Sequence, residues 1–296
     1  MTFDVMHNDE RGLRATTRKW FSHPLQRKPD LQRFDYGLRS RKYHEIMHSM
    51  WSETKARVSN RLARHLCTAP FQLLNKSPMV SFTFDDAPKS AATVGGRILD
   101  EYDARGTYYV AGGLVDKWSG NWTGVSADDI VGLHRSGHEV ACHTFSHTRV
   151  VDLNAAAMIA EIEKNRRYFM MLDSSIKVEN FAYPYGMGSF LHKAQLGQNF
   201  QSSRSIVPGI NSGIVDLQHL RATPLIEQHI DRDEIDRTFD EAVVKNGWLI
   251  FYSHDVATAP SPYGCSPSFL RHALDAASRG KIPILSVAEA LRFGGA

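Results

Sequence analysis

Two adjacent carboxylates close an apolar run of this sequence, where MVSFTF at 79–84 is followed by Asp85 and Asp86. The run alternates between large apolar and small polar residues, as a strand does, and Pro88 then ends the pattern. Successive side chains of a strand point to opposite faces, so the two acids form no single dyad unless the backbone turns between them. We therefore expect Asp85 and Asp86 to have different roles.

Two histidines, His143 and His147, lie four residues apart after another apolar run, within CHTFSH at 142–147. This spacing lets both imidazoles converge on one ion if the chain turns helically there. Two histidine nitrogens and one carboxylate oxygen are an ordinary ligand set for catalytic zinc, with one position left open. Taken alone, HxxxH is more typical of surface polar groups, but beside the acidic pair of another strand end it favours a metal site.

These residues suggest hydrolysis of an amide or ester. If Asp86 is the third ligand, Asp85 remains free to take a proton from a water that the ion activates. His254, in SHD at 253–255, is then the candidate to protonate the leaving amine, and the backbone N–H of Tyr185 is a candidate oxyanion donor. Each has a structural alternative: a helix N-cap or turn former for Asp85, a core histidine for His254, and a simple Pro-Gly turn for 183–189.

Strands and helices alternate from residue 79 onward, and they must position these side chains. Apolar runs lie at 79–84, 107–112, 138–143, 178–184, 203–207, 220–225, 248–254 and 283–287. Helical patterns, several opening on Ser, Asn or Asp and closing on Gly, lie at 90–106, 126–137, 154–172, 231–247 and 266–280. Repeated βα units predict a parallel sheet, and seven or eight of them favour a barrel, whose chemistry lies at the carboxyl ends of the strands.

The composition is that of a globular protein. The chain has 296 residues, of which 42% are hydrophobic and 10% aromatic, enough for a sizeable core. Its three cysteines, Cys67, Cys142 and Cys265, are far apart and form neither a disulfide framework nor a CxxC metal site. No run approaches the ~20 apolar residues of a membrane helix, and the N-terminus is too polar for a signal peptide, so we expect a cytoplasmic protein.

The positive charge is concentrated near the N-terminus. Residues 1–70 hold 14 Lys and Arg against 7 Asp and Glu, and apolar residues recur at helical intervals over 39–66. We therefore expect a basic helical N-terminal extension at 1–75 and a catalytic domain at 76–296. A solvated helix face packed on that domain is favoured over contact with nucleic acid or anionic lipid, so no nucleic-acid partner is expected. Homo-oligomerisation through the extension stays open.

Four motifs together resemble those of the polysaccharide deacetylase family, also called the NodB-homology or carbohydrate esterase family 4 group. They are TFDD at 83–86, GHEVACHTFSH at 137–147, YPYG at 183–186 and SHD at 253–255, in the family's order and approximate spacing. The resemblance covers about residues 79–290. It implies an α/β fold of the NodB-like type, a distorted (β/α)7-type barrel, and metal-dependent hydrolysis of an acetyl group on a sugar.

The resemblance also implies roles, which agree with those argued from the residues. Asp85 is the general base and His254 the general acid, while the Tyr185 amide lies in the oxyanion hole. The implied metal ligands are Asp86, His143 and His147. We expect the substrate to contact Pro184, Tyr185, Tyr252 and Trp248.

The sequence departs from the family pattern at several positions. Ala182 stands where many members have an arginine that pairs with the base, which leaves Asp85 without that partner. Tyr252 replaces a frequent leucine in the pocket wall. For the acid that orients His254, Asp216 is the candidate, with a helix N-cap as its alternative role.

Two further stretches resemble an exopolysaccharide-type subgroup: FAYPYG at 181–186 and PSPYGCSP at 260–267. The second contains Cys265, which we interpret as a structural thiol.

The leading interpretation is a hydrolase of non-peptide carbon–nitrogen bonds that removes an N-acetyl group, before an O-acetyl group, from a sugar or glycan. Zinc is the expected cofactor, although cobalt, nickel and manganese suit the same ligands. Finished polymers, glycan precursors, small acetylated sugars and nucleotide sugars all stay open as substrates. The alternatives are a hydrolase of a non-sugar amide and a non-catalytic, metal-containing glycan-binding protein. The last is disfavoured because it needs neither Asp85 nor His254, and both are present.

Overall fold

A computed structural model describes residues 53–296 of the chain. The predicted extension before residue 53, including the first part of the helical pattern at 39–66, lies outside the described residues. None of the helices within 53–296 combines the length and apolarity that crossing a membrane requires.

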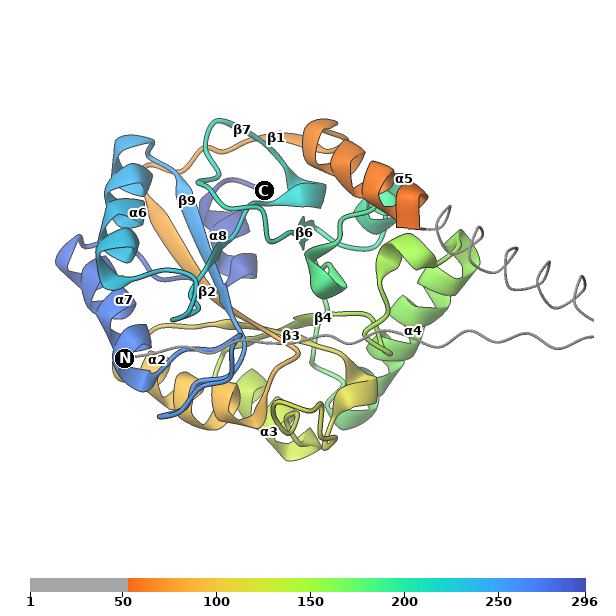
Figure 1. Cartoon of the computed structure of the whole chain (residues 1–296), viewed down its shortest axis with the longest axis horizontal. Helices are drawn as coiled ribbons and strands as arrows, with labels where there is room; N and C mark the ends of the chain where they lie inside the picture. Colours follow the sequence, from red (N-terminus) through yellow and green to blue (C-terminus); the bar gives the residue numbers. More distant parts are fainter. Residues whose placement is uncertain (1–52) are drawn as a thin grey trace, which may run out of the picture. The chain divides into compact units, whose positions relative to one another are not determined.

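The predicted α/β fold is confirmed as a curled sheet of seven parallel strands, ordered β6-β5-β4-β3-β2-β9-β8 (Figure 1). The strands are β2 (Met79–Asp85), β3 (Thr107–Val110), β4 (Glu139–Cys142), β5 (Asn180–Ala182), β6 (Ser202–Arg204), β8 (Thr223–Pro224) and β9 (Trp248–Ser253). The eighth run, predicted at 283–287, forms only an isolated bridge between Ile284 and Val80. The Leu285 N–H donates to the Val80 carbonyl, but the next residue, Ser286, is already the N-cap of a helix, so the strand pairing ends there.

The two edges of the sheet are joined through an irregular segment. The Leu220 amide donates to the Ser203 carbonyl of β6 at 2.9 Å, and the Leu220 carbonyl accepts from Ser205 at 2.8 Å. Three residues later the same segment becomes β8, which pairs with β9 at the other edge. The sheet therefore curls toward closure, and its inward side chains meet across the interior.

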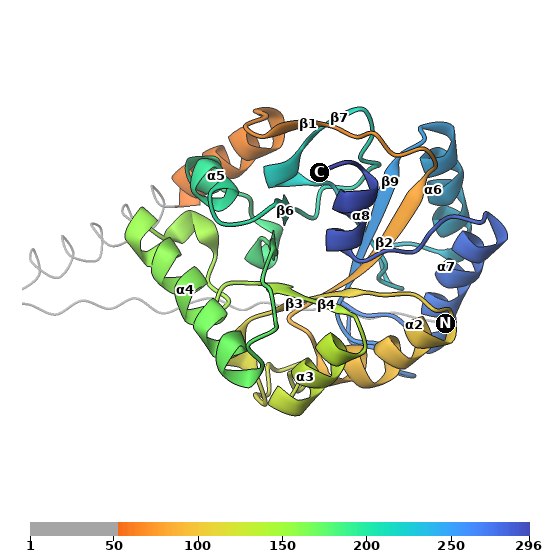
Figure 2. The same cartoon turned by 180° about the vertical axis from the view of Figure 1, so that it is seen from behind.

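The helices begin and end largely as their sequence signals predict. They are α2 (Arg97–Glu101), α3 (Ala127–Arg135), α4 (Ala155–Leu172), α5 (Phe190–Gly197), α6 (Arg232–Val244), α7 (Pro267–Arg279) and α8 (Val287–Phe293), with a π-helical turn, η1 (Ala91–Gly96), before α2. Ser126, Asn154, Asp231, Ser266 and Ser286 each accept a backbone N–H as the N-cap of α3, α4, α6, α7 and α8. Figures 1 and 2 show α2, α3, α4, α6 and α7 around the outside of the sheet.

The two faces of the sheet bury different side chains. Val80, Phe82 and Phe84 of β2 belong to the main core beneath the outer helices. Met79 faces the interior, where it packs with Ile250 of β9 and with α8. The first turn of α8 also donates backbone N–H groups to Thr107 and Glu139, at the amino ends of β3 and β4. Helix α8 therefore lies at the amino ends of these strands and leaves their carboxyl ends for the site.

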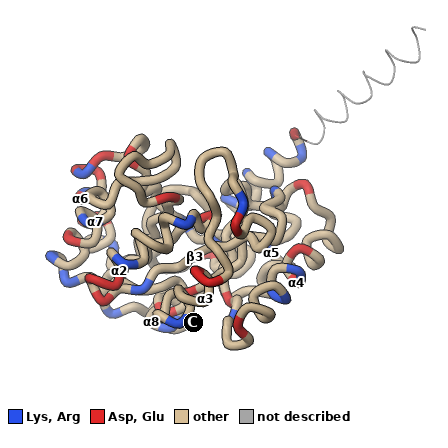
Figure 3. The backbone as a smooth tube through the Cα atoms, turned by 90° about the horizontal axis from the view of Figure 1, so that it is seen from below, with Lys and Arg blue, Asp and Glu red and all other residues tan. Residues whose placement is uncertain are grey.

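The described part of the N-terminal extension packs on the body of the domain. Residues 53–65 are helical, and this N-terminal helix lies beside α5 in both ribbon views (Figures 1 and 2). Beyond it, the extension predicted as helical also supplies a strand, β1 (Pro70–Gln72), which pairs antiparallel with β7 (Ile214–Asp216). Charged residues of both signs are interspersed along outer helices such as α4 and α7 (Figure 3).

Candidate active site

The backbone turns sharply between the two aspartates. Asp85 is the last residue of β2 and is only 4% exposed, whereas Asp86 and Ala87 have φ angles of 58° and 43°. Such left-handed angles are uncommon outside glycine and cluster at functional sites. The turn takes Asp86 out of the strand pleat, so both carboxylates lie at the carboxyl end of β2 with different surroundings.

Asp86, His143 and His147 form a cluster that can hold a metal ion, with one ligand atom of each within 4.8 Å of the others. Asp86 Oδ1 lies 3.0 Å from His147 Nε2 and 3.6 Å from His143 Nε2, and it is buried without a hydrogen-bond partner among the described residues. His143 Nδ1 lies 2.9 Å from the Ala182 carbonyl, which can only accept, so Nδ1 carries the proton and Nε2 keeps its lone pair. These donors suit a divalent cation.

The electrostatics of the cluster favour its ligand form. Burial lowers the pKa of His143 to about 4, which keeps its imidazole neutral at physiological pH. Burial alone would raise the pKa of Asp86, but the close contact with His147 and the electrostatic effect of the nearby histidines lower it to about 2. A neutral imidazole and an ionised carboxylate are the forms that bind metal.

Asp85 has a cationic partner. The alanine at position 182 had predicted that it would lack one. The guanidinium of Arg204, at the end of β6, donates through Nη2 to Asp85 Oδ1. Arg204 is fully buried and belongs to none of the four motifs. The sequence holds one hint of it, a charged residue inside the otherwise small and apolar run SRSIV at 203–207.

His254 lies one residue beyond the end of β9, next to the end of β2, because Phe84 and Ser253 are paired in the ladder. Its Nδ1 is 3.1 Å from the Tyr263 carbonyl, so Nδ1 carries a proton and Nε2 remains for exchange with a ligand. The ring packs against Trp122, 5.2 Å away by ring centroids, and Tyr263, 5.8 Å away, which also contact each other. His254 is also among the histidines that lower the pKa of Asp86, in agreement with its place in the same site.

The turn η4 (Pro184–Gly186) follows β5 and brings Tyr185 over the cluster. Tyr185 has a φ of 57° and is 61% exposed, and its ring centroid lies 4.4 Å from that of His147. Pro184, the residue before it, is buried. Tyr252 of β9 is nearly buried and lies 5.5 Å from the Arg204 guanidinium, so it forms part of the inner wall below the site.

Two expected site residues lie elsewhere. Trp248 is fully buried at the amino-terminal end of β9, where its Nε1 donates to Ser81. The cluster lies near the carboxyl end of the same strand, so Trp248 is too far away to contact a substrate there. Asp216 is the N-cap of η5 (Leu217–His219) and accepts hydrogen bonds from Lys193 and from the backbone of Thr68 and Ala69. It therefore anchors the extension, and the group that orients His254 is the Tyr263 carbonyl.

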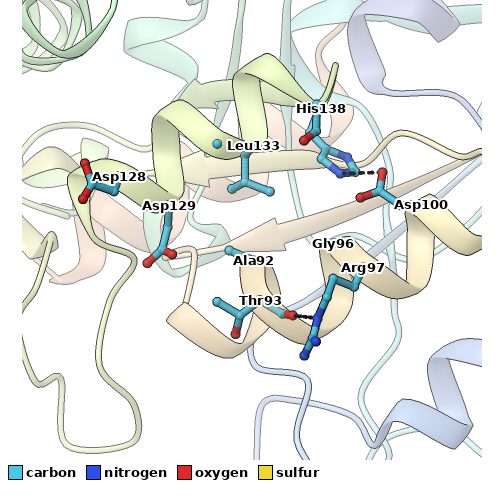
Figure 4. A pocket seen from close by; sticks show the side chains of 11 residues that line it. Ala92, Thr93, Gly96, Arg97, Asp100, Asp128, Asp129, Leu133 and His138 are labelled. Carbon is cyan, nitrogen blue, oxygen red and sulfur yellow. Dashed lines mark hydrogen bonds and ion pairs between the residues drawn. The ribbon is translucent and has the colours of Figure 1, made fainter.

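A surface pocket between η1, α2 and α3 lies on the outer side of the sheet (Figure 4). His138 points toward Asp100 there, with its Nε2 at 3.5 Å from the carboxylate. None of its lining residues belongs to the cluster or its neighbours, so the pocket is separate from the candidate site.

Comparisons with known proteins agree with the motifs. A model of the polysaccharide deacetylase family matches residues 74–198. A chitin deacetylase of Colletotrichum lindemuthianum is 27% identical over 113 residues, which are 38% of this chain and 42% of that protein. The match thus spans less than half the length of this relative.

Solved structures share the fold. The structure of the Colletotrichum lindemuthianum chitin deacetylase superposes with a TM-score of 0.54 at 18% identity, over 74% of this chain and 89% of the other. A family 4 acetyl xylan esterase from Clostridium thermocellum, in complex with a cobalt ion, superposes with a TM-score of 0.50 at 18% identity, over 72% and 90%. Residues 74–198, which include the metal cluster, thus match the polysaccharide deacetylase family, and the chain shares its fold with a solved chitin deacetylase.

Proposed function

We propose that this chain is a metal-dependent deacetylase that hydrolyses an N-acetyl group on a sugar, free or within a glycan. The observation that carries the proposal is the Asp86–His143–His147 cluster together with a buried carboxylate, Asp85, and an imidazole, His254, at the carboxyl ends of the adjacent strands β2 and β9. A binding protein has no use for both proton-transfer groups beside a metal cluster.

The ligand set fits a catalytic divalent ion, with zinc as the first choice and cobalt, nickel or manganese as substitutes. The similar acetyl xylan esterase from Clostridium thermocellum is described with cobalt. When bound, such an ion polarises an acetyl carbonyl and makes a nearby water more acidic. Asp86, His143 and His147 would hold it, and the Ala182 carbonyl would keep His143 in its ligand tautomer.

Asp85 and His254 would then divide the proton transfers. Asp85 Oδ1 is engaged by Arg204, whereas Oδ2 has no hydrogen bond with a described residue and can accept the proton of the attacking water. His254 Nε2 can deliver a proton to the nitrogen that leaves. The backbone N–H of Tyr185, in the turn over the cluster, would donate to the oxygen that gains negative charge.

Aromatic rings beside the cluster support a sugar substrate. Tyr185 packs against His147 and is largely exposed, and Tyr263, 47% exposed, lies beside His254. Sugar rings bind to aromatic faces through their C–H groups, so the two tyrosines would bracket a glycan over the acetyl site.

The proposal is tested by metal content and acetate release on one preparation. The panel runs from N-acetylglucosamine through chito-oligomers to nucleotide sugars and O-acetylated xylan. We expect about one metal per chain, acetate from at least one N-acetylated member, loss of activity with a chelator and its return with zinc. Bound metal with no acetate from any member would overturn the proposal in favour of a non-sugar amide or a binding role.

A further inference from the structure

The arginine that contacts Asp85 comes from a strand that carries none of the motifs. Arg204 is the last residue of β6, is 0% exposed, and makes its ion pair with the Asp85 carboxylate on β2. The two residues are 119 positions apart in the sequence. This pairing raises the question of how a side chain from the edge of the sheet reaches the end of β2.

The curl of the sheet and two small residues make the contact feasible. Four strand spacings separate β6 from β2 along the sheet, about 19 Å if it were flat, which is beyond the reach of an arginine. In the curled sheet the guanidinium lies over the ring of Tyr109 on β3, and the same ring packs against Ala141 and Ala182, both fully buried. Larger side chains at these two positions would occupy that space.

Position 182 is the neighbour of Arg204 in the ladder, because Ala182 and Arg204 are paired between β5 and β6. An arginine at 182 would project from β5 into the same interior. The small side chain of Ala182 thus leaves space for the guanidinium of Arg204 on the neighbouring strand.

The guanidinium is held on several sides. Its carbon lies 4.9 Å from the Tyr109 ring centroid and 5.5 Å from that of Tyr252, and Nη1 donates to the Ser205 carbonyl at 3.1 Å. Asp85 is the one carboxylate with which it forms an ion pair among the described residues. A planar donor fixed by two rings restricts the carboxylate oxygen that it contacts.

We propose that Arg204 is the positioning residue of the base Asp85. It fixes the carboxylate through Oδ1 and turns Oδ2 toward the metal cluster. An arginine in the third motif would make this contact from β5, whereas Arg204 makes it from β6. This inference rests on the proposed function, because the base matters only if the chain hydrolyses its substrate. Arg204 itself contacts neither the cluster nor the turn at Tyr185.

Three variants test the role: Arg204→Met, Arg204→Lys and the double variant Arg204→Met/Ala182→Arg. Arg204→Met should lower kcat about 100-fold with KM and metal content unchanged, because misorienting one catalytic group costs about that factor. The double variant should regain at least tenfold of the loss, since its guanidinium enters the same space from the next strand. Arg221→Met, at an exposed arginine of the segment before β8, is the control and should match the wild type.

Crystal structures of the same zinc-loaded variants give a readout without turnover. Asp85 should leave its wild-type orientation in Arg204→Met and return to it in the double variant. Should Arg204→Met fail to fold, Arg204→Lys and the double variant carry the test. A folded Arg204→Met chain with kcat within about threefold of wild type, or with Asp85 unmoved, would overturn the role, as would a double variant without recovery. Absence of acetate from the wild type contradicts the proposed function instead, and the Asp85 orientation still decides the role of Arg204.

Discussion

Asp85 and Asp86 are adjacent in the chain, yet the left-handed backbone at Asp86 gives their carboxylates different partners. Asp86 faces two histidine nitrogens, and Asp85 faces a guanidinium. We predict that Asp86→Ala or His143→Ala lowers both bound metal and activity, whereas Asp85→Asn keeps the metal and lowers kcat by about 10²- to 10⁴-fold. Metal analysis and acetate release on the same samples check this.

His254→Ala provides the matched comparison, since it should also retain the metal and lose most turnover. The roles would be reversed if Asp85→Asn lost the metal and Asp86→Asn kept it.

The three cysteines differ in reactivity because they differ in burial. Burial raises the pKa of Cys142 to about 11 and that of Cys265 to about 12, and Cys67 is exposed. Thiolates are the reactive species, so iodoacetamide should label the native chain at Cys67 alone and all three cysteines after unfolding. Mass spectrometry counts the labels, and fast labelling of native Cys265 would contradict its interpretation as a structural thiol.

The N-terminal helix is fixed by one buried lysine of α5. Lys193 donates to the carbonyls of Ala63 and Leu66 at the end of that helix and forms an ion pair with Asp216. Lys193→Met leaves Asp216 without its cation and should cost about 3–5 kcal/mol of the free energy of unfolding. It should also expose residues 53–66 to trypsin.

Lys245→Met is the control, because Lys245 pairs with Glu241 on the exposed face of α6 and contributes only ~0.3–0.5 kcal/mol. Denaturant unfolding and limited proteolysis compare the two variants. Equal stability of both would show that Lys193 does not anchor the helix.

The strand ends explain which parts of the site could be predicted. Asp86, His143 and His147 directly follow apolar runs that the sequence shows as strands. Because the carboxyl ends of parallel strands meet at one end of the sheet, these three residues could be predicted to lie together. Trp248 is the first residue of β9, so the same rule places it at the end of the strand away from the site, and its expected contact with the substrate did not follow from the strand pattern. Arg204 was missed because its contact depends on the curl of the sheet, which no local pattern encodes.

The irregular segments were the least predictable part of the fold. The run at 283–287 has the composition of a strand but contributes one bridge, and strand β1 lies in a stretch that shows no alternation. In both places tertiary hydrogen bonds decide the conformation, because the intrinsic strand propensity of the local sequence contributes less than they do.

The stability of the whole domain should depend on pH through buried neutral histidines. Burial, with a smaller contribution from the Lys193 charge, lowers the pKa of His219 to about 4, against about 6.5 for an unfolded histidine. Between these values the unfolded chain binds the extra proton. Stability is therefore fully present above about pH 6.5 and falls toward pH 4, by at most about 1.4 kcal/mol per pH unit for this group.

Denaturant unfolding from pH 7 to pH 4 measures this slope. His219→Gln should flatten it, whereas His229→Gln, at an exposed histidine, should leave it unchanged. Identical slopes for the wild type and His219→Gln would contradict the assignment.

The Asp85–Arg204 pair also bears on how the sheet acquires its register. Strands β5 and β6 have three residues each, so few ladder bonds fix their alignment. A slip of β6 by one residue turns Arg204 to the outer face and leaves Asp85 buried without its cation, at a cost of about 3–5 kcal/mol. Slower or less complete refolding of Arg204→Met is the expected signature. If Arg204 has the proposed role, the contact that orients Asp85 would also select, during folding, the strand alignment in which the candidate site is assembled.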